Sequence, residues 1–207
     1  MNAFVVIAAA GIALWLRPWR GLAAAGGPPW PWLAAWAVMP LLWGLDGHAA
    51  GPLVQPMSGA AMLVLLAGWP LTILALLPVA AITVLAGGTG WIEGLHRLVW
   101  LGVAPATFTL AIGGALRRWL PHNVFVYILG RGFLGSFVSC ALAGWAAVAV
   151  HGSPIGTGIN DLLLARLLNA FGEAFLTGML AAILVAFRPQ WLATYTDRLY
   201  LTERPRD

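Results

Sequence analysis

The chain has 207 residues, of which 61% are apolar and only 9% are charged. A soluble domain carries about 25% charged residues, so this composition excludes a soluble globular protein and indicates an integral membrane protein. All eleven basic residues are arginines, mostly in short polar segments, so they report orientation in the bilayer rather than nucleic-acid binding. At about 20 residues per span, the chain has room for a single domain over residues 1–207. We expect an all-α polytopic transmembrane helix bundle of about six to seven spans.

Seven helices are predicted, separated by polar loops or by loops rich in glycine and proline. Their ranges are Asn2–Leu16, Trp30–Leu45, Gln55–Ala67, Pro70–Leu85, Leu98–Leu116, Val124–Val150 and Asp161–Phe187. The third and fourth belong to one apolar run that is too long for a single span and that Gly68-Trp69-Pro70 interrupts. The short third helix is expected to be re-entrant or broken, which membranes tolerate only where protein or water covers the open backbone. The segment Gly87–Arg97 is predicted to be a loop.

The arginines are distributed unevenly between the two sides of the predicted bundle. Eight fall in the loop after the first helix, in the pair that ends the fifth helix and in the C-terminal tail, whereas the opposite loops hold only Arg97. The positive-inside rule therefore predicts an outside N-terminus and a cytoplasmic C-terminus in a multi-pass protein of the bacterial inner membrane. No charge precedes the first apolar stretch, which favours a retained span over a cleaved signal.

Three histidines fall on the predicted outer side, together with acidic residues. Imidazole and carboxylate are ligands for nickel, cobalt and zinc, so a shallow outer vestibule of these side chains is a candidate metal site. The candidate ligands are His48, His96, His151, Asp46 and Glu93. The alternative interpretation is that these histidines lie at the membrane interface only because they are polar.

Charged residues inside the apolar stretches are the second group of candidates. An ion in lipid costs on the order of several kcal/mol unless it is paired or hydrated, so it marks a functional site by default. Arg131 in the sixth predicted helix and Glu173 in the seventh are expected to form an intramembrane charge pair, which serves either as a gate or as a lock on helix register. Small residues from Gly130 to Gly144 give the sixth helix a flat face, for packing within the chain or against another subunit.

Sequence motifs of common enzymes are missing. The chain contains no His-Glu-x-x-His zinc-protease motif, no phosphate loop of the nucleotide hydrolases and no Gly-x-Ser-x-Gly nucleophile turn. We therefore expect a protein that is not an enzyme and holds no permanently bound cofactor, and whose ATP hydrolysis, if any, is supplied by a partner.

Three segments in the second half carry a family resemblance. Leu120–Tyr127 after the twin arginine, Gly172–Met179, and Arg188–Trp191 followed by Asp197–Leu201 are similar to cobalt/nickel-type energy-coupling-factor (CbiM-like) transporter permeases of a proteobacterial branch. The resemblance implies a substrate-binding membrane subunit of an importer. Such a subunit works with a coupling membrane subunit and cytoplasmic ATPases and takes up a transition-metal ion such as cobalt or nickel.

The chain also departs from that family. Its metal-binding members begin with Met-His, whereas this chain begins Met1-Asn2, and a second histidine-bearing segment of the family reads Val54–Gly59 here, without histidine. Either the outer histidines replace these ligands, or the solute is not a metal ion. A second functional hypothesis is a non-transporting membrane scaffold or assembly factor that uses the small-residue face and the basic tail.

Overall fold

The computed structural model describes residues 1–19, 30–44, 55–88, 90–154, 156–196 and 200, and every regular element in these residues is helical. The first half of the chain forms α1 (Asn2–Trp15), α3 (Trp30–Gly44), α4 (Ala60–Ala67) and α5 (Trp69–Gly87). The second half forms α6 (Trp91–Arg97), η2 (Leu98–Val103), α7 (Ala104–Trp119), η3 (Val126–Leu134), α8 (Gly135–His151), α9 (Ile159–Phe187) and η4 (Pro189–Trp191). The helix α6 continues through η2 into α7, and η3 continues into α8.

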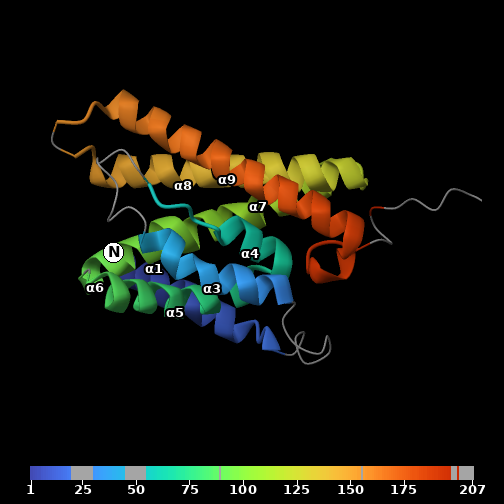
Figure 1. Cartoon of the computed structure of the whole chain (residues 1–207), viewed down its shortest axis with the longest axis horizontal. Helices are drawn as coiled ribbons and strands as arrows, with labels where there is room; N and C mark the ends of the chain where they lie inside the picture. The colour runs from blue at the N-terminus through green and yellow to red at the C-terminus, as the bar shows by residue number, and fades with distance from the viewer. Residues whose placement is uncertain (20–29, 45–54, 89, 155, 197–199, 201–207) are drawn as a thin grey trace, which may run out of the picture.

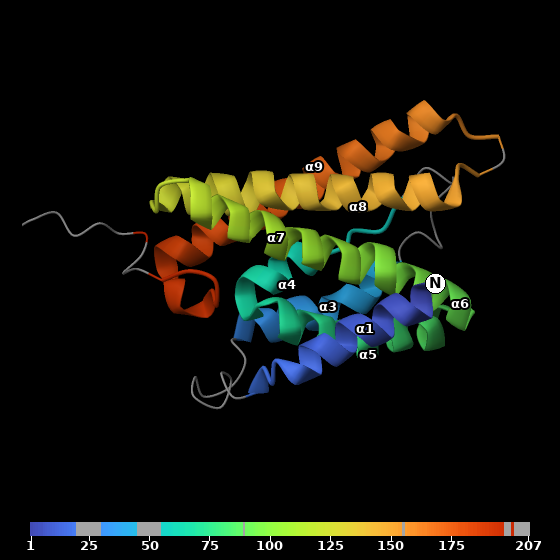
Figure 2. The same cartoon turned by 180° about the vertical axis from the view of Figure 1, so that it is seen from behind.

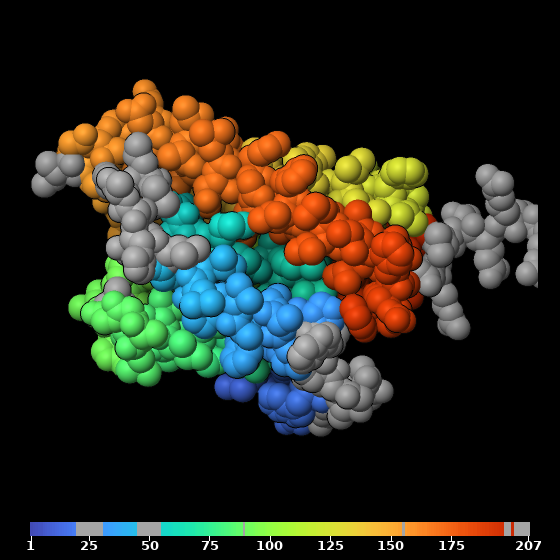
Figure 3. Space-filling model, viewed as in Figure 1, coloured from blue at the N-terminus to red at the C-terminus, as the bar shows by residue number. Residues whose placement is uncertain are grey.

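The bundle has two sides with α4 between them. Helices α8 and α9 run next to each other along one side, and α1, α3 and α5 form the other side (Figures 1 and 2). On the face drawn in Figure 3, the teal residues around α4 show only at the seam between α9 and α3. The backbone groups at the ends of a short helix enclosed in this way must find their hydrogen-bond partners in the surrounding protein.

Four helices of the described residues are long and apolar enough to cross a membrane. They are Trp69–Gly87, Trp91–Trp119, Val126–His151 and Ile159–Phe187. Large apolar side chains such as Phe4, Leu168 and Phe175 are exposed on the outside of the bundle, as expected of a surface that faces lipid. The prediction of a helical membrane protein is therefore supported, whereas six to seven spans and the orientation stay predictions, since α1 has 14 residues and α3 has 15.

The break predicted at Gly68-Trp69-Pro70 is confirmed. Gly68 has φ 81° and ψ 164°, a conformation that ends α4 and lets α5 begin at Trp69 with Pro70 in its first turn. The helix begins at Ala60 rather than at Gln55, because residues 55–59 are not helical and Gly59 is left-handed, with φ 65°. The third predicted helix is thus an irregular segment followed by a buried helix of 8 residues.

The prediction of a loop over Gly87–Arg97 is wrong for its second half, where α6 forms. Gly94 does not interrupt this helix but serves its packing. A Cβ at Gly94 would lie 2.3 Å from a methyl carbon of Val84, so only glycine lets α6 approach α5 this closely. His96 and Glu93 therefore lie on a helix rather than on a loop.

Glycines also set the register between the two long antiparallel helices. A Cβ at Gly132 would lie 3.1 Å from that of Ala181, and a Cβ at Gly178 would lie 3.0 Å from that of Phe133. Further along, Gly144 makes room for the aliphatic stem of Arg166. The small-residue face of the sixth predicted helix is thus used for packing within the chain.

We predict that Gly178→Ala destabilises the protein by about 1–3 kcal/mol, because the new methyl group meets the Cα and Cβ of Phe133 and the helices must separate. The midpoint of thermal unfolding in detergent measures this change. Gly172→Ala, on the same helix with no atom within 4 Å of the new Cβ, is the matched control and should leave the midpoint unchanged or raise it. Equal effects of the two substitutions would contradict the packing described here.

Candidate functional site

The start of α4 is held by a buried carboxylate. Glu173 of α9 is 2% exposed and accepts hydrogen bonds from the backbone N–H groups of Ser58 (2.9 Å) and Gly59 (2.8 Å). The Cys140 thiol also donates to this carboxylate, and the Ser58 hydroxyl oxygen accepts from the N–H of Ala60 at 3.1 Å. Glu173 therefore supplies the acceptor that the backbone lacks at the start of a helix, where a negative charge is also favoured.

The end of α4 is held by the segment that follows α9. The N–H of Ala193 donates to the carbonyl of Leu66 at 3.2 Å. The hydroxyl of Thr194 donates to the carbonyl of Leu65 at 3.1 Å and shares a hydrogen bond of 2.8 Å with the hydroxyl of Tyr127. Both ends of the buried helix are thus satisfied by α9 or by residues directly after it.

A polar chamber lies beside the start of α4. Its empty volume, counted with the space that opens to the surroundings, is about 220 Å³. Its lining comes from the irregular segment before α4, from η2 and α7, from α8 and from α9: Gln55, Ser58, Trp100, Pro105, Cys140, Ala143, Arg166, Asn169 and Glu173. A polar hollow among apolar helices is the kind of place where membrane transport proteins bind their solutes, at a broken helix.

Two hydrogen-bond donors of the residues that line the chamber have no partner among the described residues. Nη1 of Arg166 and Nε1 of Trp100 are both buried, and neither has a hydrogen-bond partner within the described part of the chain. The acceptor capacity of Glu173, by contrast, is engaged by the amides and the thiol. A solute in the chamber would therefore offer its own acceptor atoms to Arg166 and Trp100.

Two of the predicted metal ligands come together next to this chamber. His96 at the end of α6 and His151 at the end of α8 have ring centroids 4.5 Å apart. The ring of His151 also lies 5.6 Å from that of Trp100, which lines the chamber. Nδ1 of His151 is 3.0 Å from the carbonyl of Ala147 and must donate to it, which leaves the lone pair of Nε2 for another partner.

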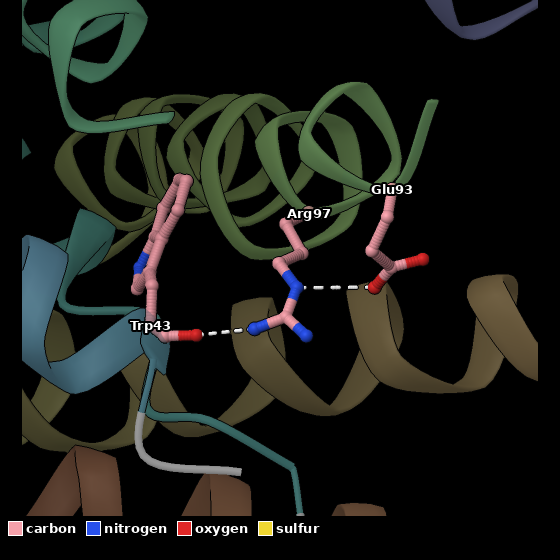
Figure 4. A network of polar contacts seen from close by, with 3 residues as sticks. All are labelled: Trp43, Glu93 and Arg97. Carbon is pink, nitrogen blue, oxygen red and sulfur yellow. Dashed lines mark hydrogen bonds and ion pairs between the residues drawn. The ribbon is translucent and has the colours of Figure 1, made fainter. Parts of the chain in front are cut away.

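Glu93, another predicted metal ligand, is engaged by an arginine. Glu93 pairs with Arg97 at 3.0 Å, and Arg97 also donates to the carbonyl of Trp43 (Figure 4). Asp46 and His48 lie outside the described residues. Among the residues that are described, no three His, Cys, Asp or Glu side chains form a group able to hold a metal ion. Of the predicted vestibule, the described residues thus bring together the pair His96 and His151.

The structure does not bring Arg131 and Glu173 together. Glu173 lies level with Cys140 of α8. Gly132, the residue after Arg131, instead packs against Gly178 and Ala181 of α9. Arg131 instead points toward α7, where its guanidinium lies against Gly113. The register that the glycines impose thus separates the two ions by more than one helical turn.

Sequence reasoning did not assign Arg166, Trp100 or Asn169 to a site. A signal for two of them was present, because Arg166, Asn169 and Glu173 are spaced three and four residues apart and so share one face of α9. A polar stripe on an otherwise apolar helix predicts a lined cavity. No comparable signal marks Trp100, since tryptophans are frequent in this chain.

Comparison of this chain with models of protein families, with curated proteins and with solved structures finds no match.

We predict that Glu173→Gln destabilises the protein by about 1–3 kcal/mol, because the new amide group presents a donor to one of the two backbone N–H groups. The matched control is Glu93→Gln, which removes a half-exposed pair with Arg97 and should change stability by less than about 1 kcal/mol. Thermal unfolding in detergent compares the two variants, and a larger loss for Glu93→Gln would refute the role assigned to Glu173.

Proposed function

We propose that this protein is a substrate-binding membrane subunit of an importer of the energy-coupling-factor type, and that its solute is a divalent transition-metal ion of the nickel and cobalt class. The observation that carries the metal assignment is the pair His96 and His151, which two separate helices bring within 4.5 Å, centroid to centroid, beside a polar chamber. Imidazole is the protein ligand that suits these ions best.

The metal belongs at the histidines rather than deep in the chamber. The guanidinium of Arg166 repels a bare cation at Glu173, and the carboxylate there is already occupied by backbone N–H groups. The hydrogen bond from Nδ1 of His151 to Ala147 orients the ring and leaves Nε2 to bind metal, as backbone carbonyls do for histidines at known metal sites. Water completes the coordination shell of an ion captured at two imidazoles.

Transport is favoured over a scaffold by the use of the small-residue face. The scaffold hypothesis requires that face to be open to partners, whereas Gly132 and Gly144 pack against α9. The short buried helix α4 and the chamber beside it are features that a scaffold does not need, and broken helices beside polar cavities are typical of transport proteins.

We predict that the purified, tag-free protein binds nickel or cobalt and that His96→Ala and His151→Ala each weaken binding at least about tenfold. Calorimetric titration with nickel, cobalt and zinc measures the affinities. His122→Ala, at the other end of the bundle, is the control and should bind as the unaltered protein does. Affinity weaker than about millimolar, or affinity that survives both substitutions, rules out the metal assignment.

We further predict that cross-linking in the native membrane, followed by mass spectrometry, recovers a second membrane subunit and an ATPase with a phosphate-loop motif, because the sequence lacks such a motif of its own. Membrane vesicles of the assembled complex should take up the metal only with ATP. Recovery of membrane-protein biogenesis factors in place of an ATPase would support the scaffold hypothesis instead.

A further inference from the structure

A second hollow lies at the other end of the bundle, where α7 ends and η3 begins. Its empty volume, counted with the space that opens to the surroundings, is about 230 Å³. Its lining includes Arg117, Arg131 and His122, and no acidic residue lines it in the part of the chain that the structure describes. The hollow is therefore a concentration of positive charge without a counter-ion among the described residues.

Arg131 is the central group of this hollow. Its Nε is buried without a hydrogen-bond partner in the part of the chain that the structure describes. Its Nη1 reaches only the carbonyl of Thr194, at a long 3.5 Å. An arginine held this way inside a membrane-spanning segment is costly unless an anion is added to its surroundings.

The shape around Arg131 is built to accept the guanidinium. A Cβ on Gly113 would lie 2.8 Å from Nε and 3.0 Å from Nη2, so the missing side chain of this glycine is what admits the group. The wall opposite is fixed, because the hydroxyl of Tyr127 shares a hydrogen bond with Thr194. The donors therefore have a set position before any ligand arrives, which favours affinity.

The level of the hollow in the membrane, near the interface, suits a phosphate group. Arg117 lies in the last turn of α7, and Trp119, two residues later, is largely exposed, as tryptophans are at the membrane interface. Basic pockets between transmembrane helices at this level bind phosphate-bearing headgroups, and the planar fork of arginine matches phosphate oxygens. We propose that Arg131, Arg117 and His122 form a binding site for a phosphate group, which a lipid headgroup or free phosphate supplies.

The test is native mass spectrometry of the delipidated full-length protein in detergent. The probes are dioctanoyl phosphatidylglycerol, inorganic phosphate and, as the phosphate-free match, dioctanoylglycerol. We expect phosphatidylglycerol to bind and dioctanoylglycerol to bind far more weakly. If inorganic phosphate competes with the lipid, free phosphate is also a ligand of the site; if only the lipid binds, the headgroup is the source. If neither phosphatidylglycerol nor inorganic phosphate binds, the proposal is overturned.

Matched variants locate the binding. Arg131→Gln should weaken phosphatidylglycerol binding at least about tenfold, whereas Arg118→Gln, whose arginine does not line the hollow, should not. Gly113→Ala should also weaken binding by displacing the guanidinium, whereas Gly114→Ala, with no atom within 4 Å of its new Cβ, should not. Since the glycine variants keep every charge, they keep the test valid if Arg131→Gln fails to fold. Binding unchanged in Gly113→Ala, or reduced equally in the two control variants, refutes the site.

Discussion

The structure depends on how the backbone of α4 is satisfied. A helix of 8 residues leaves a large share of its N–H and C=O groups without partners inside the helix, and a bilayer offers no water to replace them. Glu173 meets the N–H groups that precede the helix, and Ala193 and Thr194 meet the carbonyls at its end. All of these groups come from α9 or from the residues that follow it. The other helices enclose α4, but the last helix holds it in place.

The two hollows follow from the same arrangement. One lies beside the start of α4, where Glu173 reaches its amides, and the other reaches Thr194, which bonds the last turn of α4. Each hollow also takes a side chain from a π-helical stretch, Trp100 from η2 and Arg131 from η3. Such wider turns alter the direction of side chains and occur often at functional sites. Each hollow therefore lies next to an irregular stretch of helix.

Much of the fold could be predicted from the sequence, because apolar length and helix-breaking residues are local signals. The break at Gly68-Trp69-Pro70 and the late helices were of this kind. The register between α8 and α9 could not be predicted in this way, because it depends on which glycines meet which side chains across the interface. This register places Cys140, not Arg131, level with Glu173. The hydropathy pattern predicted that His96 and His151 lie on the same side of the membrane, and the structure places their rings together. The spare donors of Arg166 and Trp100 had no local signal that distinguishes a lined chamber from ordinary packing.

The long-range tethers of α4 have a consequence for how the protein is made. Ser58 emerges from the ribosome 115 residues before Glu173, and Leu65 emerges 129 residues before Thr194. At about 5–20 residues per second, the short helix waits roughly 6–25 s for the groups that complete it. During that time its backbone groups lack these protein partners, and the hydrocarbon core of a bilayer offers no replacement. It can settle between its neighbours only when the final hairpin has been inserted, which makes the end of synthesis the step that commits the chain to its native arrangement.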